Sequence, residues 1–353
     1  MAGLVGGSGV VVCCGPGGVG KTSVAASVAL ESARRGRRAA VVTVDPARRL
    51  ADALGIAELG NTPQRIEGSW SGELWALMLD ARSTFDALVQ AQAVRPGQAE
   101  AILANRFYRN IAGALSGTQE YMAMEKLHEL HASGHYDVIV VDTPPTRNAL
   151  DFIDAPRRLV RFLDNRLTRL VLFPTRASLR AVNVAAQAFL RTVSKVVGGE
   201  VVGEAVAFFQ TFEGMEAGFR TRARQVQDLL AAEGTAFLLV TSPRADAVDE
   251  SRYLAERLVE GGIAVSGLVV NRGHPPFDEV VLDLPTGSAA AGPLARLEAN
   301  LRDLRARAAV EEAEVARLAA EIGSAPVSRV PLLAGDVCDL EGLGRLGRYV
   351  FAA

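Results

Sequence analysis

Short hydrophobic runs, several of them rich in valine, recur along the chain and are separated by stretches with helical periodicity. Three of the runs, at residues 10–14, 39–44 and 136–141, are continuously apolar rather than alternating, which is typical of parallel strands that helices cover on both faces. We expect strands at residues 10–14, 39–44, 74–79, 136–141, 236–241, 263–270 and 327–330. Their alternation with helices predicts an α/β fold with a doubly wound, mostly parallel sheet, in which ligands bind at the carboxyl ends of the strands.

One segment interrupts this alternation. From about residue 159 to 232 the apolar residues recur at helical spacing, and we interpret this segment as a helical insertion. Helical patterns also cover residues 23–34 and 293–322, and another helix ends near residue 262. Apart from a GSAAAG stretch near Gly287, the chain has no low-complexity linker and no internal repeat. Residues 1–353 are therefore predicted to form a single domain that contains the insertion.

Composition narrows the possible partners. The 353 residues carry 38 Lys and Arg against 40 Asp and Glu, a net charge of -2. This balance argues against binding to nucleic acid or acidic lipid through bulk charge, and no nucleic-acid partner is expected. The mean hydropathy is +0.17, yet no run approaches the roughly 18 to 20 apolar residues of a membrane-spanning helix. The apolar surplus must therefore be buried or bind something.

The cysteines point to a reducing environment. There are three, of which Cys13 and Cys14 are adjacent and Cys338 is alone, so they cannot form a disulfide framework. We therefore expect a cytoplasmic protein. Adjacent residues on a strand face opposite ways, so Cys13 and Cys14 cannot chelate a metal as a CxxC pair does. We expect all three to be buried structural thiols, and the stretch before Val10 to lead into the first strand rather than to act as a signal peptide.

The stretch GPGGVGKT, at residues 15–22, follows the first strand and opens a helix. It matches G-x-x-x-x-G-K-[ST] in the structural context that this phosphate-binding motif requires. The glycines allow backbone N–H groups to face phosphates, Lys21 brings an ammonium to the β- and γ-phosphates, and the Thr22 hydroxyl can bind Mg²⁺. We expect the nucleotide phosphates to be bound by Gly15, Gly17, Gly18, Val19, Gly20, Lys21, Thr22 and Ser23.

Two aspartates stand where predicted strands end. Asp142 closes the run YDVIVVD, which has the pattern of a Walker B strand, and Asp45 closes AAVVTVD. Either one alone would be better explained as a helix cap that follows a strand. Together, and beside a phosphate loop, they favour a site for Mg²⁺ and for the attacking water.

Further stretches extend this pattern almost from end to end. They are Asp45-Pro46-Ala47, Gly117-Thr118-Gln119-Glu120 with Met122-Ala123-Met124, Asp142-Thr143-Pro144-Pro145-Thr146, Asn271 after GLVV, and VPLLAGD at residues 330–336. With the phosphate loop, they resemble the ATPase family that includes the arsenical pump-driving ATPase and the targeting factor for tail-anchored membrane proteins. The resemblance implies the fold of P-loop NTPases.

The resemblance also implies roles for individual residues. ATP and Mg²⁺ would be the cofactors, with Thr22, Asp45 and Asp142 serving the metal site. Lys21 and Asp45 would be catalytic, the latter by positioning the attacking water. Asn271 and Pro331 would frame the adenine. Without the resemblance, Asn271 would be interpreted as a turn residue at a strand end.

One departure from the family concerns the second residue of the phosphate loop. Relatives carry a lysine there that reaches the partner's phosphates across a dimer, whereas this chain has Pro16. Proline removes both the ammonium and one backbone N–H. We therefore expect slow hydrolysis by a homodimer, unless Arg48, Arg49, Arg147 or Arg244 replaces the lysine or a lysine-bearing paralogue completes a heterodimer.

The insertion leaves two alternatives open. It holds more large apolar side chains than the cover of one sheet requires, namely Phe162, Leu163, Leu167, Leu170, Leu172, Phe173, Phe189, Leu190, Phe208, Phe209, Phe212 and Met215. In the targeting factors the corresponding helices form a groove for a transmembrane helix. Ordinary core or dimer contacts would explain the same residues equally well.

These features together predict an ATP- and Mg²⁺-dependent ATPase that works as a dimeric nucleotide switch. Hydrolysis would be coupled to a hydrophobic protein client or a membrane-associated partner. Two alternatives remain: the energising subunit of an anion exporter, or a slow regulatory subunit of a heterodimer.

Overall fold

The computed structural model describes residues 1–45, 47–111, 118–144, 154–161, 164, 199–275, 277 and 291–352. Within these residues one sheet of eight strands has the order β3-β4-β2-β5-β1-β6-β7-β8. Neighbouring strands are parallel except β3 and β4, which are antiparallel at the edge. The strands are β1 Val10–Cys14, β2 Arg38–Thr43, β3 Gln64–Ile66, β4 Glu73–Met78, β5 Val138–Asp142, β6 Thr235–Thr241, β7 Val265–Gly273 and β8 Val327–Pro331.

The strand order confirms the predicted doubly wound α/β fold. The chain moves from β1 to β2, β4 and β5 on one side of the sheet, and later to β6, β7 and β8 on the other. Strand β1 therefore lies at the point where the winding changes direction. In such sheets this switch point leaves a crevice at the carboxyl ends of the strands, and the loop at residues 15–22 begins there.

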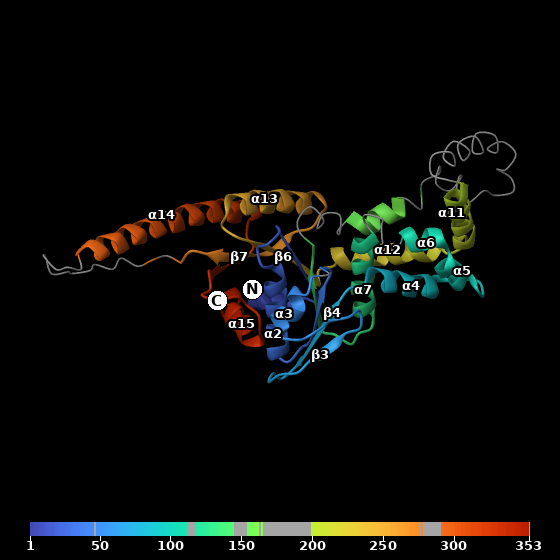
Figure 1. Cartoon of the computed structure of the whole chain (residues 1–353), viewed down its shortest axis with the longest axis horizontal. Coiled ribbons are helices and arrows are strands. Elements are labelled where there is room, and N and C mark those ends of the chain that lie inside the picture. The colour runs from blue at the N-terminus through green and yellow to red at the C-terminus, as the bar shows by residue number, and fades with distance from the viewer. Residues whose placement is uncertain are drawn as a thin grey trace.

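Helices cover both faces of the sheet (Figure 1). On one face lie α2 Lys21–Arg34, α3 Arg49–Leu54 and α15 Leu340–Val350, packed against Val11 and Cys13. On the other lie α7 Thr118–Ala132, α12 Glu216–Ala231, α13 Ala245–Glu260 and α14 Ala291–Ile322, whose buried residues belong to the same core as Val12 and Cys14. The two adjacent cysteines thus point to opposite faces and are buried, as expected.

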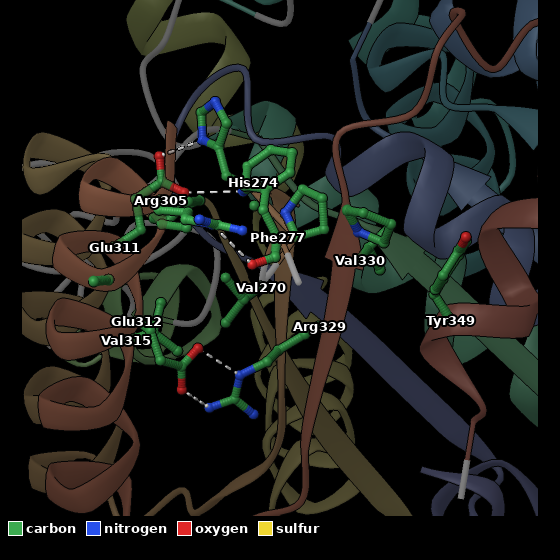
Figure 2. Close-up of a pocket in the computed structure, with 16 residues that line it drawn as sticks. Val270, His274, Phe277, Arg305, Glu311, Glu312, Val315, Arg329, Val330 and Tyr349 are labelled. Atoms are coloured by element: carbon green, nitrogen blue, oxygen red, sulfur yellow. Dashed lines mark hydrogen bonds and ion pairs between the residues drawn. The ribbon is translucent and has the colours of Figure 1, made fainter. Parts of the chain in front are cut away.

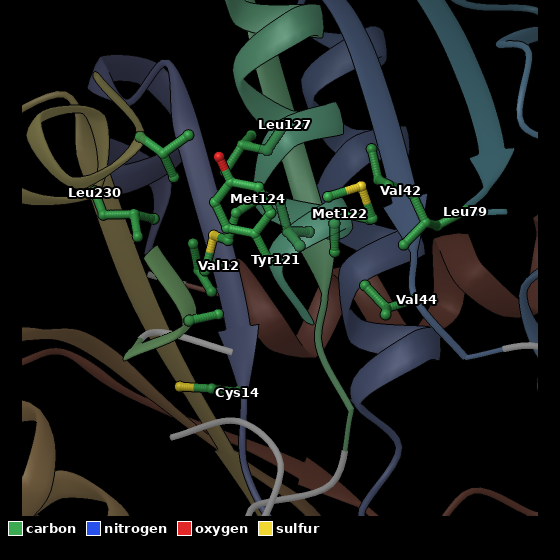
Figure 3. Close-up of a cluster of buried hydrophobic side chains, with 14 of the residues drawn as sticks. Val12, Cys14, Val42, Val44, Leu79, Tyr121, Met122, Met124, Leu127 and Leu230 are labelled. Atoms are coloured by element: carbon green, nitrogen blue, oxygen red, sulfur yellow. The ribbon is translucent and has the colours of Figure 1, made fainter. Parts of the chain in front are cut away.

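Helix α7 supplies a large part of the second core. Its Met122, Met124 and Leu127 are almost fully buried and lie over Val12 and Val42 of the central strands (Figure 3). These apolar side chains remove one face of the parallel strands from water. Their burial explains why the strand sequences are continuously hydrophobic instead of alternating.

A group of helices extends beyond the sheet edge (Figure 1). It comprises α4 Ala81–Gln92, α5 Gln98–Ala104, α6 Arg106–Ile111 and α11 Gly199–Phe212, and residues 154–161 are also helical. Aromatic rings join these helices: Phe208 stacks on Tyr108 at 6.0 Å between ring centroids, and Phe212 contacts Phe219 at 5.0 Å.

The sequence left open whether the large apolar residues of the insertion form a groove or an ordinary core, and the aromatic rings in this helical group answer this for some of them. Phe208, Phe212 and Met215 are buried in the core, and Phe209 is partly buried against it. They pack as ordinary core residues. The other large apolar residues named for the insertion, Phe162, Leu163, Leu167, Leu170, Leu172, Phe173, Phe189 and Leu190, lie outside the described residues.

The structure differs from the sequence predictions at three places. Residues before the first strand form a short helix, α1 Ala2–Gly7, where the glycine-rich sequence indicated only an extended lead into β1. Edge strand β3 was missed because only Ile66 of its three residues is buried. The prediction that all cysteines are buried is wrong for Cys338, which is exposed just before α15.

No helix in the described ranges combines the length and the apolar character needed to cross a bilayer. The apolar surplus noted in the sequence is accounted for, in those ranges, by the two cores on either side of the sheet.

Substitution of Phe237, on β6, tests the assignment of the hydrophobic core. It is 1% exposed, so F237A should lower the free energy of unfolding by about 3–5 kcal/mol, because it removes a buried ring and leaves a cavity. Val259 on α13 is 65% exposed, and V259A should change stability by less than about 0.5 kcal/mol. Urea unfolding of both variants checks this, and similar losses in the two would contradict the assignment of the core.

Candidate nucleotide-binding site

The phosphate loop depends on glycines for its backbone path. Gly18 and Gly20 adopt left-handed φ values of 75° and 93°, and Gly15 has a φ of 150°. L-residues with a side chain avoid such conformations because Cβ meets the backbone. At Gly15 the approach is also close, since a Cβ there would lie 1.9 Å from the Val240 carbonyl oxygen on β6.

The loop leads directly into α2, whose N-cap is Gly20. Because glycine has no side chain to cap the helix, the first backbone N–H groups of α2 stay available to an anion. Helix N-termini with free N–H groups are established phosphate-binding positions. The fourteen-residue helix therefore points its positive end to the crevice at the end of β1.

Lys21 lies in the first turn of this helix and is 7% exposed. Its Nζ donates a hydrogen bond to the Pro16 carbonyl at 2.8 Å. Burial lowers the pKa of the Lys21 ammonium, while the nearby carboxylate of Asp142 acts in the opposite direction. The ammonium is thus held across the loop, in the place where a phosphate would exchange for the Pro16 carbonyl.

Asp142 ends strand β5 and is 1% exposed. Its Oδ2 accepts hydrogen bonds from Thr22 Oγ1 at 2.7 Å and from Thr43 Oγ1 at 2.9 Å. Its Oδ1 is buried and has no hydrogen-bond partner among the described residues. Burial raises the pKa of Asp142 to about 6, against the opposing effect of the two hydroxyl donors.

This arrangement fits a magnesium ion. Mg²⁺ prefers oxygen ligands and commonly binds one or two protein groups together with phosphate oxygens and water. Thr22 and Asp142 would hold it, because their oxygens are in contact and one carboxylate oxygen has no other partner. The buried carboxylate is costly without a cation, which is a physical reason to expect one there.

Asp45 lies just beyond the end of β2, close to this site. Its backbone N–H donates to Thr43 Oγ1 at 3.2 Å, and Thr43 in turn donates to Asp142. Its carboxylate accepts from the Ala47 N–H at 2.9 Å and lies 3.5 Å from Arg49 Nη1. The structure therefore brings Asp45 to the same end of the sheet as Thr22 and Asp142; its neighbour Pro46 is outside the described residues.

The segment that precedes the Walker B strand also reaches this end of the sheet. Gln119, at the start of α7, donates through Nε2 to the Val44 carbonyl at 3.1 Å. Val44 is adjacent to Asp45, so α7 is linked directly to the loop that carries Asp45.

Asn271 and Pro331 occupy different surroundings. Asn271 is 7% exposed, and its Nδ2 donates to the Val19 carbonyl of the phosphate loop at 2.8 Å. Pro331, at the end of β8, lines a cavity instead. The prediction that the two frame an adenine therefore remains a prediction, with Asn271 held on the loop side.

The cavity that Pro331 lines has a volume of about 730 Å³ and lies at the carboxyl ends of β7 and β8, against α14 (Figure 2). Its walls are mostly apolar and include Pro243, Val270, Gly273, Phe277, Ala308, Val315, Val330 and Pro331. Polar pairs lie among them: His274 Nδ1 is 2.8 Å from Glu311 Oε1, and Arg329 Nε donates to Glu312 at 2.9 Å.

Of the residues that line this cavity, sequence reasoning assigned a ligand-binding role only to Pro331. Its walls come from five separate segments of the chain, and the α14 residues that face it are an ordinary stretch of a charged, alanine-rich helix. These α14 residues line the cavity only because α14 packs beside β7 and β8.

The candidate replacements for the missing lysine are in different situations. Arg49 pairs with Asp45, and Arg244 pairs with Asp246 at 2.6 Å on the exposed start of α13. Arg48 is the exposed residue that precedes α3, and Arg147 lies outside the described residues. Among these four, only Arg49 contacts a predicted catalytic residue in the described part of the chain.

The fold and this loop define a P-loop nucleotide-binding protein. Residues 8–290 match the family model of the anion-transporting ATPases. An uncharacterised protein of Streptomyces coelicolor is 30% identical over 82% of this chain and 67% of its own length. ATPase GET3 of Malassezia globosa is 26% identical over 96% of this chain and 90% of its own. A protein described as an arsenical pump-driving ATPase, from Aquifex aeolicus, is 21% identical over 97% and 78%.

The chain therefore belongs to the anion-transporting ATPase family, and it is an ATPase. The resemblance drawn from its motifs is confirmed.

Alanine substitutions at two loop glycines measure two different costs, which are backbone strain alone at Gly18 and backbone strain with a steric clash at Gly15. G18A should cost about 1–2 kcal/mol for its left-handed φ alone, because nothing in the described chain lies within 4 Å of the added Cβ. G15A should cost clearly more, since the backbone of β6 cannot move away from its Cβ. Urea unfolding of both variants measures the difference, and equal losses would contradict the described loop path.

Ionisation of Asp142 should lower the stability of the folded chain when no nucleotide is bound. Its folded pKa of about 6 exceeds its ordinary value of 3.8, so its ionisation disfavours the folded state as the pH rises from about 4 to 6. This gap corresponds to about 3 kcal/mol. In the absence of nucleotide, D142N should therefore be more stable than the wild type at pH 8, by up to that amount, with no such gain near pH 4.

Asp137 provides the control for this experiment. Hydrogen bonds from Arg38 lower its pKa to about 2, so its ionised form favours the folded state. D137N should be less stable than the wild type at pH 8, and this loss should vanish as the pH falls through 4 to about 2. Chemical unfolding against pH checks both signs, and a loss of stability by D142N at pH 8 would contradict the assignment.

Proposed function

We propose that this ATPase is a dimeric nucleotide switch that binds ATP with its phosphates on residues 15–22. Mg²⁺ would be bound by Thr22 and Asp142. The observation that carries the proposal is the buried Asp142 oxygen that has no partner among the described residues, beside the Thr22 hydroxyl. A carboxylate in such surroundings is best explained by a cation that arrives with the nucleotide.

The residues of the site suggest how the γ-phosphate would be transferred to water. Asp45 would orient the water for in-line attack from its place beyond β2. Lys21 would leave the Pro16 carbonyl and bind phosphate oxygens, and the N–H groups of the loop and of α2 would stabilise the charge that develops on them. The metal, when bound, neutralises further charge on the phosphates. Release of the γ-phosphate would then free Asp45 and the loop linked to α7 through Gln119.

The adenine base would occupy the cavity of about 730 Å³ beside Pro331. Support comes from its apolar walls, which suit a flat aromatic base, and from its position at the carboxyl ends of β7 and β8, next to the strand end that contacts the phosphate loop. Asn271 would border the base from the loop side.

Pro16 bears on the oligomer and on the rate. The family's lysine at this position acts across a dimer, and a cation at the developing charge can be worth roughly 10³ to 10⁵ in phosphoryl transfer. A homodimer of this chain would therefore hydrolyse ATP slowly. A heterodimer with a paralogous ATPase that carries the lysine would supply the missing cation to one site.

The switch would act in the cytoplasm on a hydrophobic protein client or a membrane-associated partner. The resemblance to the targeting ATPases supports this role, as does the link from the Asp45 loop through α7 to the helices beyond the sheet. An alternative role, as the energising subunit of an anion exporter, is supported by the description of the matched family. A slow regulatory subunit of a heterodimer is the alternative that Pro16 supports.

The catalytic assignments are tested with the full chain. K21A should abolish measurable MgATP binding, because it removes the cation inside the loop. D45N should still bind MgATP but lose at least about a hundredfold in kcat, as expected when the group that orients the water is removed. D52N, which alters an exposed carboxylate on α3, should match the wild type. Equal turnover by D45N and the wild type would contradict the role of Asp45.

The three roles predict different stimulants of turnover. A client carrier should bind a transmembrane peptide in an ATP-dependent way, an exporter subunit should be stimulated by arsenite or another oxyanion, and a regulatory subunit should turn over only when a lysine-bearing paralogue is added. Brisk turnover by the pure chain that does not depend on protein concentration would contradict both the slow homodimer and the heterodimer.

A further inference from the structure

The end of strand β7 contacts the phosphate loop through two consecutive residues. Asn271 Nδ2 donates to the Val19 carbonyl at 2.8 Å, and Arg272 Nη1 donates to the Gly18 carbonyl at 3.1 Å. The two residues are also joined to each other, because Asn271 Oδ1 accepts from the Arg272 N–H at 3.0 Å. Two neighbouring carbonyls of the loop are therefore held from one strand end.

The backbone at Arg272 is unusual. Its φ is 62°, and it is the one non-glycine residue with a positive φ in the described part of the chain. Left-handed backbone is unfavourable for a residue with a Cβ, and arginine has no short polar side chain that would compensate locally. A glycine would fit this position without strain, so the arginine side chain must contribute something that glycine cannot.

The close fit of the loop to this strand end is visible at Gly20. A Cβ on Gly20 would lie 2.4 Å from Asn271 Nδ2. The absence of a side chain at this position thus allows Asn271 to reach the Val19 carbonyl. The loop and the end of β7 are packed as one unit.

The chemistry of the loop explains what these contacts achieve. A phosphate loop binds anions through backbone N–H groups, so its carbonyl oxygens must point away from the phosphates, which they would repel. Arg272 and Asn271 turn the Gly18 and Val19 carbonyls toward β7 by binding them. The same peptide planes then present their N–H groups on the opposite side, where the phosphates would lie.

Arg272 also places a positive charge beside the phosphate loop, which lacks the lysine that relatives carry at the position of Pro16. Pro16 contributes neither a backbone N–H nor a lysine ammonium. Of the arginines considered as replacements, Arg49 pairs with Asp45 and Arg244 with Asp246. Arg272 instead binds the loop itself, and nothing in the loop motif alone points to it.

We propose that Arg272 is a positioning residue of the phosphate loop, which it holds in its phosphate-binding shape through the Gly18 carbonyl, and that its charge partly offsets the loss at Pro16. The proposal rests on the proposed function, in which this loop binds the phosphates of ATP. Arg272 is not assigned a step in the chemistry.

The test uses variants that separate the side chain from the backbone. R272N removes the guanidinium but tolerates the left-handed backbone, and R272K keeps the charge without the forked geometry. R65N is the control, because it removes an arginine on edge strand β3, at the opposite edge of the sheet from β8, whose side chain is 51% exposed and pairs only with Glu67 in the described chain. For each full-length variant we would measure the Kd for MgATP with a fluorescent analogue and the Tm without nucleotide.

R272N should weaken MgATP binding about tenfold, as expected for one hydrogen bond from a charged group. Its Tm without nucleotide should stay within a degree or two of the wild type, R272K should recover part of the affinity, and R65N should match the wild type. A structural role alone would instead lower the Tm together with the affinity. R272G, which relieves the strained φ, should keep or raise the Tm and still bind MgATP weakly.

Two failures can be distinguished. If the wild-type chain does not bind MgATP, the proposed function is wrong and this inference falls with it. If the wild type binds but R272N and R272G bind equally well, or if R65N weakens binding as much as R272N does, the proposed function stands and the role of Arg272 is overturned.

Discussion

The structure of the site depends on a carboxylate that is removed from water at the end of a central strand. Asp142 is held by hydroxyl groups from Thr22 at the start of α2 and Thr43 at the end of β2, and one of its oxygens has no partner in the described chain. These bonds tie three elements together at one point. An ionised group in this place is unfavourable until a cation joins it, so the carboxylate that ties these elements together is also the group that most needs a ligand.

A second constraint acts on the other side of the phosphate loop. Asn271 and Arg272 of β7 bind the Val19 and Gly18 carbonyls, so the N–H groups of the same peptide planes face the opposite side of the loop. The nucleotide site therefore draws on both halves of the doubly wound sheet. The same strand end borders the cavity beside Pro331, which places a candidate base pocket and the phosphate loop on one continuous support.

Much of the fold was predictable because its signals are local. Parallel strands buried on both faces leave continuous apolar runs, and β1, β2, β4, β5 and β6 were placed to within one or two residues, whereas β7 continues three residues beyond its predicted end. Edge strand β3 carries one buried residue and helix α1 is rich in glycine, so neither leaves a pattern. Cys338 was expected to be buried from the average behaviour of cysteine, but a short loop before α15 leaves it exposed.

The sequence by itself determined the class of protein, the phosphate loop and the aspartates at the ends of β2 and β5, because these depend on residue type, spacing and position after a strand. Only the tertiary structure decided that Asn271 turns to the loop, that Arg272 adopts a left-handed backbone beside it, and that α14 closes a cavity over β7 and β8. Each of these joins segments far apart in the chain, and contacts between distant segments depend on packing rather than on any local pattern.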